Sequence, residues 1–136
     1  MINAPVATVF AFHERADALE LLTPAFPPVH VVAKTGSITV GARVELRVMG
    51  LKWVALHTVY QNNRLFVDEQ IQGPFTQWTH RHEFRDLGDT TELTDRVTYR
   101  LPGGPVVNAL LGWTVTPGLH QMFQHRHRVT KQYCEG

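Results

Sequence analysis

The chain has 136 residues, and its 13 basic and 12 acidic side chains give a formal net charge of +1. A chain of this length forms one domain and buries about two thirds of the surface of its unfolded state. We therefore expect one hydrophobic core that needs no disulfide or metal ion to hold it together. The near-balanced charge supplies no field that would hold nucleic acid or an anionic membrane. The sequence therefore predicts neither as a partner.

The cysteine content and the hydropathy of the sequence indicate the cellular compartment of the protein. Cys134 is the single cysteine, so it can form neither an internal disulfide nor a cysteine metal site. No stretch approaches the ~20 apolar residues that span a bilayer, and no basic region followed by an apolar one opens the chain. These features predict a cytoplasmic protein without stable membrane insertion.

The N-terminal segment predicts two short helices. Pro5 suits an early helical position, and the apolar residues that follow keep helical spacing up to His13. Ala18 to Leu22 predict a second helical turn, which the prolines from Pro24 onward end.

The middle of the chain, from Val29 to Leu101, changes to a period of two and carries turn residues at short intervals. This pattern is typical of an antiparallel meander. The clearest predicted strands are Arg43 to Met49, Lys52 to Tyr60, Arg64 to Gln72, Phe75 to Asp86 and Thr90 to Leu101.

The last segment, from Pro105 to Tyr133, predicts a long helix. Pro117 and Gly118 predict a kink or break near Thr116, because an interior proline removes a helical hydrogen bond. The order of two short helices, several strands and a long helix predicts an α+β domain with the helix across one sheet face. The apolar stripe of this helix comprises Val106, Leu110, Trp113, Leu119, Met122, Phe123 and Val129.

Two turns predict which side chains share the buried face of the sheet. If Asp86 lies opposite Thr91, then His82 faces Asp95. If Ile71 lies opposite Thr76, then Glu69 joins the same face. A slip of one residue would move a whole strand to the other face. The expected neighbours also include Trp78 beside Tyr99, His80 beside Val97 and Val67, Leu65 beside His82, and Val59, His57, Ala55 and Trp53 on the next strand.

The histidines and carboxylates predicted on the inner face favour a ligand-binding site, because a purely structural core seldom buries unpaired polar groups. The functional interpretation is an apolar pocket with a few polar groups that orient a ligand. The structural alternative is a collapsed interior in which His82 and Asp95 are a satisfied cross-strand pair.

The sequence resembles the START-like (SRPBCC) superfamily, which includes polyketide cyclases, lipid-transfer domains and Bet v 1-like plant proteins. The resemblance is closest to a bacterial ligand-binding branch and covers nearly the whole chain. It is carried by APVATVFAFH at 4–13, FVDEQIQGPFTQWTHRHEF at 66–84, LTDRVTYRLPGGP at 93–105 and MFQHRH at 122–127.

The resemblance implies a helix-grip fold, in which a curved seven-stranded sheet and the C-terminal helix enclose a deep cavity for hydrophobic or amphipathic molecules. Only Met1 to Asn3 precede the APV segment, so we expect the first strand of the family to be missing or greatly shortened. The resulting open sheet edge would allow a homodimer.

The resulting hypothesis is a single domain, residues 1–136, that binds a small hydrophobic or aromatic molecule such as a lipid, quinone or polyketide. One alternative is a cyclase or dehydratase in which Asp95 orients His82 as acid or base. Another is a non-catalytic protein-interaction module that uses the open edge. The predicted ligand-binding residues are Trp53, His57, Glu69, Trp78, His80, Tyr99, Met122, Phe123 and Arg126.

Two further expectations concern metals and the final helix. His80 and His82, with Glu69 or His57, resemble part of a metal-ligand set, but their spacing fixes no third ligand, so no metal or cofactor is predicted. The resemblance implies that Arg126 lies near the end of the pocket, where a salt bridge with Glu69 or Asp68 is expected, and His127 is expected to lie on a solvated basic face.

Overall fold

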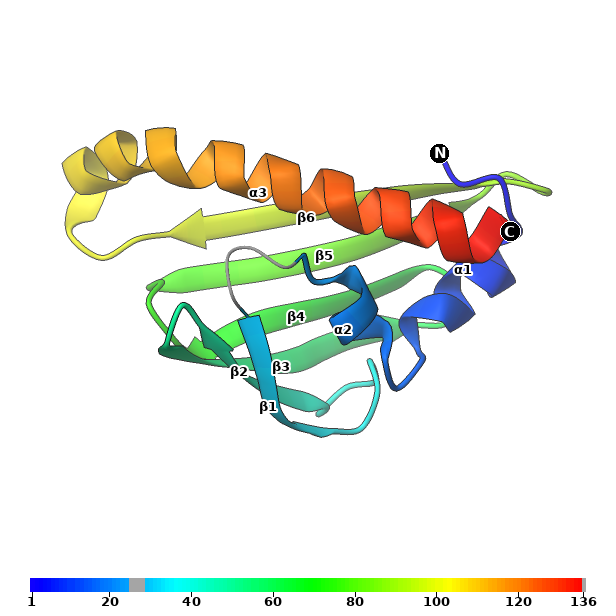
Figure 1. The fold of residues 1–136 in the computed structure, drawn as a ribbon, viewed down its shortest axis with the longest axis horizontal. Helices are drawn as coiled ribbons and strands as arrows, with labels where there is room; N and C mark the ends of the chain where they lie inside the picture. Colours follow the sequence, from blue (N-terminus) through cyan, green and yellow to red (C-terminus); the bar gives the residue numbers. More distant parts are fainter. Residues whose placement is uncertain (25–28, 136) are drawn as a thin grey trace.

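The computed structural model describes residues 1–24 and 29–135, and the side chains within these ranges except those of residues 110–115. A curved sheet is crossed on its concave side by the long helix α3, with two short helices beside it (Figure 1). The elements are α1 (Val6–His13), α2 (Ala18–Leu22), β1 (Val29–Thr35), β2 (Arg43–Val48), β3 (Leu51–Gln61), β4 (Leu65–Gln72), β5 (Gln77–Asp86), β6 (Thr91–Arg100) and α3 (Gly104–Glu135). The predicted α+β helix-grip architecture is confirmed.

The six strands lie in chain order, and each pairs antiparallel with the next. The five predicted strand runs match β2 to β6 within two residues at either end, whereas β1 was not singled out within the predicted sheet region. The register shifts in β3 between Val54 and Ala55 and between His57 and Val59. Such bulges bend a strand and increase its twist, which helps the sheet to curve around α3.

The N-terminal residues replace a full first strand with a single bridge. Ile2 exchanges two backbone hydrogen bonds with Thr91, of 2.8 and 2.9 Å, and its side chain is buried. The expected shortening of the first strand is therefore observed, and the described residues form six strands where the resemblance implied seven.

Helix α3 is continuous through Pro117, so of the kink or break predicted near Thr116 the break does not occur. Proline removes one hydrogen bond, and the exposed position of Pro117 leaves its ring free of packing against the sheet. Of the predicted stripe, Val106 is exposed and Leu110 and Trp113 lie outside the described side chains. The half-buried members are Leu119, Met122, Phe123 and Val129. Within the described residues, no helix has the length and apolar character that a bilayer crossing requires.

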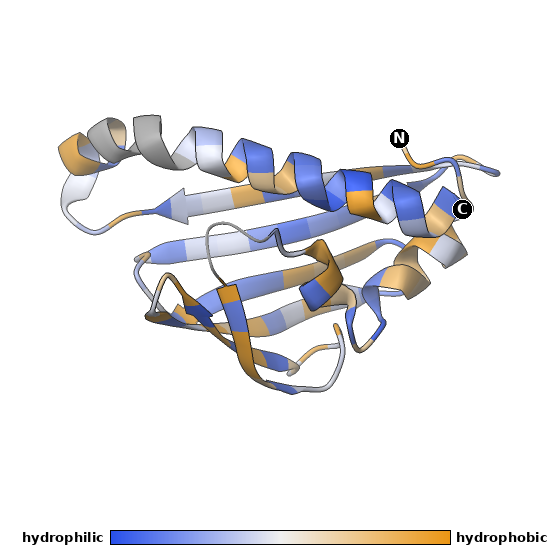
Figure 2. Ribbon diagram, in the orientation of Figure 1, coloured by the Kyte–Doolittle hydropathy of each residue, from blue (hydrophilic) through white to orange (hydrophobic). Residues whose placement is uncertain are grey.

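The hydrophobic core fills one end of the space between sheet and helices. The ring of Phe10 on α1 meets Phe84 edge to face with centroids 4.9 Å apart, and Phe66 at 6.1 Å. Apolar residues dominate α1 and α2, whereas α3 carries many polar residues (Figure 2). The core thus occupies the end of the sheet that α1 covers.

Candidate functional site

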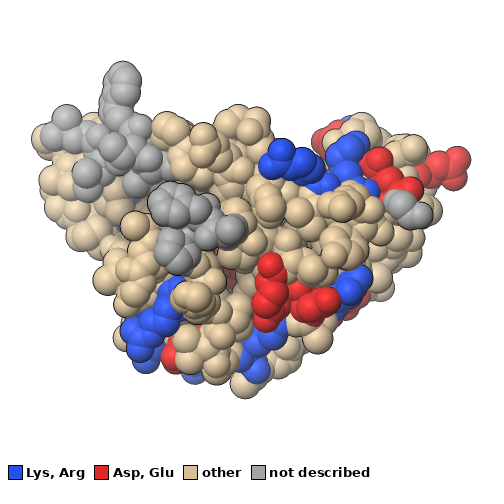
Figure 3. Space-filling view, viewed as in Figure 1, with Lys and Arg blue, Asp and Glu red and all other residues tan. Residues whose placement is uncertain are grey.

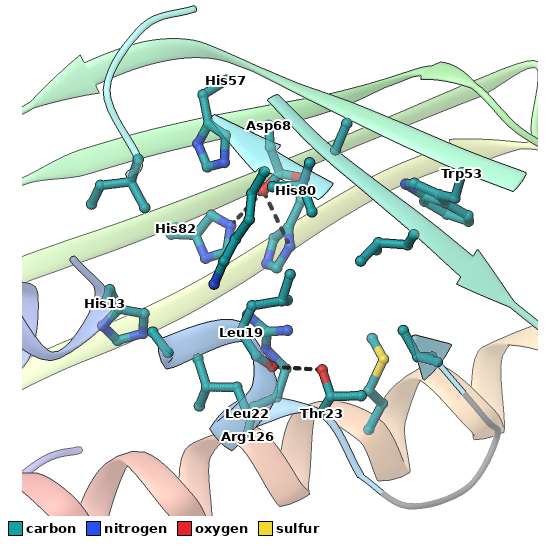
Figure 4. Close-up of a pocket in the computed structure, with 18 of the residues that line it drawn as sticks. His13, Leu19, Leu22, Thr23, Trp53, His57, Asp68, His80, His82 and Arg126 are labelled. Atoms are coloured by element: carbon teal, nitrogen blue, oxygen red, sulfur yellow. Dashed lines mark hydrogen bonds and ion pairs between the residues drawn. The ribbon is translucent and has the colours of Figure 1, made fainter. Parts of the chain in front are cut away.

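A cavity of about 660 Å³ lies between the concave face of the sheet and the helices α2 and α3. This volume is typical of small-molecule sites, which run from about 300 to 1,000 Å³. Figure 4 shows His57, Asp68, His80 and His82 on the sheet side, across the cavity from Leu19, Leu22 and Arg126. Charged side chains on the outer face nearest the viewer gather in a few clusters, with uncharged surface between them (Figure 3). Apolar lining residues include Leu19, Leu22, Val44, Leu46, Trp53, Phe66, Phe75, Trp78, Leu119 and Met122.

Strand β5 supplies the centre of the polar wall. Its alternate residues Trp78, His80, His82 and Phe84 are buried, because successive side chains of a strand point to opposite faces. Its register with β6 places His82 opposite Asp95, as predicted. The connection from Leu87 to Thr90 is short and turns at Gly88, so its length fixed this register.

Strand β4 is shifted by one residue from its predicted register. Phe66 lies opposite His82 and Asp68 opposite His80, so Asp68 faces the cavity and Glu69 takes the other face. The expected inward position of Glu69 is therefore wrong, and so are the inward positions expected for Leu65, Val67 and Ile71. Ile71 is 49% exposed.

The register of β4 is shifted because β4 and β5 are joined by a four-residue loop, residues 73–76, in place of a tight turn. The side chain of Gln70 closes this loop. Its Nε2 donates to the carbonyl of Phe75 at 2.6 Å, and its Oε1 accepts from the amide of Phe75 at 3.3 Å. A sequence pattern does not reveal such a side-chain contact.

Strand β3 continues the inner face with Trp53, Ala55 and His57, which line the cavity as predicted. The bulge after His57 then changes the alternation, so Tyr60 lies opposite Phe66 and Val59 opposite Val67. Val59 is thus on the outer face, contrary to the prediction.

His82 and Asp68 form a buried hydrogen-bonded pair. His82 Nε2 lies 2.8 Å from Asp68 Oδ2, and the imidazole stacks on Phe66 with ring centroids 3.8 Å apart. Burial acts to lower the pKa of His82, but the hydrogen bond to Asp68 and the nearby Asp95 carboxylate outweigh it, so the pKa is raised. Burial acts to raise the pKa of Asp68, and the hydrogen bond from His82 overrides it and lowers that pKa to about 2. The hydrogen bond thus favours the imidazolium form of His82 and the carboxylate form of Asp68.

His80, Asp95 and His127 form a second hydrogen-bonded group that joins β5, β6 and α3. Asp95 Oδ1 accepts from His80 Nε2 at 2.7 Å, and Oδ2 accepts from His127 Nε2 at 2.6 Å. Burial opposes ionisation of Asp95, but these hydrogen bonds hold its pKa well below its usual range. Burial and the adjacent His82 lower the pKa of His80 to about 4, so this imidazole is neutral at pH 7.

The pairing within the cluster differs from the predicted dyad. His82 donates to Asp68 rather than to Asp95, whose Oδ1 is 3.3 Å from His82 Nδ1 without forming a hydrogen bond. The Nδ1 atoms of His57 and His82 are buried and have no hydrogen-bond partner among the described residues. His57 has a lowered pKa because it is buried, so it too faces the cavity as a neutral ring.

The ligand atoms of Asp68, His80 and His82 lie within 4.8 Å of one another, a spacing that a metal ion accepts. Two of the imidazole nitrogens are already hydrogen-bonded to carboxylates, His80 to Asp95 and His82 to Asp68. These two bonds would have to break before either Nε2 atom could bind an ion, whereas His82 Nδ1 has no hydrogen-bond partner among the described residues.

The structure brings most of the predicted site residues to the cavity. Asp95 lies behind His80, Phe123 packs edge to face on His80 at 5.0 Å, and Tyr99 packs against Trp78 at 6.2 Å, but none of the three is part of the lining. Those that line it are Trp53, His57, Trp78, His80, His82, Met122 and Arg126.

Three polar residues of the cluster were not predicted as site residues, namely Asp68, His13 and His127. Asp68 would have followed from the correct register of β4. His127 lies one residue from Arg126 on α3, and its contact with Asp95 places it against the sheet rather than on a solvated face. His13 lines the cavity from the end of α1, and burial lowers its pKa to about 3.

The fold and cavity agree with a comparison to protein families. Residues 2–125 match the family described as polyketide cyclase / dehydrase and lipid transport. The chain belongs to this family. A comparison with curated protein sequences gives no match.

Solved structures confirm the family fold. TTHA0849 from Thermus thermophilus superposes with a TM-score of 0.70 at 18% identity, covering 98% of this chain and 91% of that one. Ara h 8.0201 gives a TM-score of 0.68 at 15% identity, covering 98% and 91%. A START superfamily protein from Mycobacterium smegmatis gives 0.60 at 19% identity, covering 98% and 92%. At these identities the likeness concerns the fold that polyketide cyclase and lipid transport proteins share, which agrees with the START-like and Bet v 1-like resemblance.

Proposed function

We propose that this protein binds one small hydrophobic or aromatic molecule in the cavity between the sheet and α3. The observation that carries the proposal is an open cavity of about 660 Å³ with largely apolar walls and one polar wall. Apolar burial supplies affinity, and a few fixed polar groups orient the ligand. The family membership supports a role in holding such molecules.

Aromatic side chains suit the proposed ligand. Trp53 and Trp78 meet edge to face with centroids 5.1 Å apart, and Phe75 lies 5.0 Å from Trp78. All three line the cavity, and Figure 4 shows Trp53 at the end away from His13. Flat aromatic or unsaturated ligands gain from such contacts beyond the area they bury.

The test is native mass spectrometry of protein purified from its own host, followed by organic extraction. We expect a retained compound at one per chain, or one-to-one uptake from a panel of lipids, quinones and polyketides. A clean unliganded mass with no uptake from the panel would reject the proposal and favour the protein-interaction alternative, which expects a dry, collapsed interior.

A second candidate is acid–base catalysis of the cyclase or dehydratase type. The observation in its favour is the contrast on one wall of the cavity between His82, whose pKa is raised beside Asp68, and His80, whose pKa is lowered to about 4. A proton donor and an acceptor side by side are what enolisation and dehydration require. His82→Gln separates the two candidates, since an enzyme would lose turnover by about 100-fold or more, whereas a binder would change affinity modestly.

A further inference from the structure

We propose that the ligand carries a carboxylate, which binds the guanidinium of Arg126. This inference rests on the proposed binding function and names the chemical class of the ligand. It starts from the environment of Arg126, which was predicted both as a ligand-binding residue and as the partner of Glu69 or Asp68 in a salt bridge.

Arg126 is a half-buried residue of α3 that lines the cavity and points toward the sheet (Figure 4). Its guanidinium carbon lies 5.8 Å from the ring centroid of Phe123, a neighbour on the same helix. This cation–π contact steadies the side chain but uses none of its five N–H donors.

Other cations on the cavity wall already have carboxylate partners. Arg15 pairs with Asp17 at 2.9 Å, and Lys34 pairs with Glu20 at 3.1 Å. Arg126 forms no ion pair with any carboxylate of the described residues, so the predicted bridge to Glu69 or Asp68 is absent there. Residues 25–28 and 110–115 contain no Asp or Glu that would change this.

The acidic groups nearest the cavity are occupied. Asp68 accepts from His82, and Glu14 accepts from the hydroxyl of Tyr60 at 3.1 Å. Burial, with the charges of His82 and Arg126, lowers the pKa of His13 to about 3, so His13 brings no competing positive charge at neutral pH. Among the described residues that line the cavity, Arg126 is thus the one cation without a carboxylate partner.

Filling the cavity makes that unpaired charge costly. An apolar ligand would strip water from the guanidinium and leave its donors unsatisfied. A carboxylate would accept two parallel N–H bonds from the planar guanidinium, the geometry for which arginine is best suited. The complementary ligand is a hydrophobic body with a carboxylate at the end that lies near α3.

The test compares acids with alcohols of matched shape by isothermal titration calorimetry. The pairs are decanoate with 1-decanol and 2-naphthaleneacetate with 2-naphthaleneethanol. The proteins are the wild type, Arg126→Gln, Arg126→Lys and the control Arg128→Gln, whose exposed side chain lies on the same helix.

We expect the wild type and Arg128→Gln to bind at least one acid about tenfold or more tightly than its alcohol, the size of a hydrogen bond to a charged group. Arg126→Gln should lose this preference, and Arg126→Lys should keep part of it. Equal affinity of acid and alcohol in the wild type, or an unchanged preference in Arg126→Gln, would overturn the inference while leaving the binding function intact. Failure of both pairs to bind the wild type would reject the inference and count against the binding function.

Discussion

Asp68 and Glu69 are adjacent acidic residues of β4 with opposite surroundings. Asp68 sits against three histidines and lines the cavity, whereas Glu69 points to the other face of the sheet. The sequence alone does not distinguish the two, because either carboxylate could accept a hydrogen bond from a buried histidine. Only the register of one strand decides which of them belongs to the site, and the side-chain contact of Gln70 with Phe75 sets that register.

Asp68→Asn should lower the pKa of His82. The substitution removes the hydrogen-bonded carboxylate that outweighs the effect of burial on this histidine. Histidine proton chemical shifts followed against pH by NMR measure the change, with Glu69→Gln as a matched control on the outer face. An equal pKa of His82 in wild type and Asp68→Asn would contradict the assigned pairing.

At the scale of elements, local patterns predicted the strands and the β5–β6 register well, because a short connection and strict alternation leave few choices. The β4–β5 loop, the bulges of β3 and the continuous α3 were not predictable in this way. The β4–β5 loop depends on the side-chain contact of Gln70 with Phe75, and other parts of the site depend on contacts between residues distant along the chain. Asp95 illustrates such a contact, since it ties β5 and β6 to α3 through His80 and His127.

Asp95→Asn should destabilise the protein by about 3 kcal/mol, because it removes a buried charge that accepts two hydrogen bonds and leaves His80 and His127 poorly matched. The side chain of Asp95 is 6% exposed, so water does not replace these bonds. Urea unfolding measures the loss. Glu92→Gln, which breaks an exposed pair with Arg85 on the neighbouring strand, should cost less than about 1 kcal/mol. A cost for Asp95→Asn as small as that of Glu92→Gln would show that the three-element junction carries little stability.

Pro117→Ala should stabilise the protein. The helix already runs through this exposed position, so alanine restores a backbone donor without loss of packing. An interior proline costs up to about 3 kcal/mol relative to alanine, and we expect a gain of roughly 1 kcal/mol or more. Urea unfolding at pH 7 measures the difference in the free energy of unfolding between Pro117→Ala and the wild type. Lower stability of Pro117→Ala would mean that α3 needs the proline at this point.

For the whole molecule, the sequence and its resemblance predicted a helix-grip domain, and the order of its elements is confirmed. The cavity could be predicted only as a family feature, because its size depends on how far α3 stands from the sheet. The packing of the helices against the sheet also buries several histidines and so lowers their pKa values. Burial lowers the pKa of His13 and His57, and that of His80 falls to about 4 from burial and the charge of His82.

These lowered pKa values predict that stability falls between pH 6.5 and 5. In this window the unfolded chain binds protons that the folded chain excludes, so each such histidine costs up to about 2 kcal/mol. The contribution of His82, whose pKa is raised, is fully present below pH 6.5 and is lost only as pH rises through its folded-state pKa. Those of Asp68 and Asp95 are lost only at more acidic pH.

Urea unfolding at pH 6.5 and 5 tests this dependence. The variant His13→Phe, which keeps an aromatic ring beside Phe66 and Phe84, should show a smaller loss than the wild type. His120→Gln, on α3 outside the buried cluster, should match the wild type. Constant stability of the wild type across this window would contradict the neutral state of the buried histidines.

The cavity as a binding site is tested most directly by filling it. Met122→Trp adds volume to a half-buried lining position of α3, and Gln121→Trp places the same side chain on the exposed side of the helix. Native mass spectrometry with the compound that the wild type retains should show a one-to-one complex for the wild type and Gln121→Trp, and none for a folded Met122→Trp. Undiminished binding by Met122→Trp would place the ligand elsewhere, and no complex with the wild type would contradict the binding function itself.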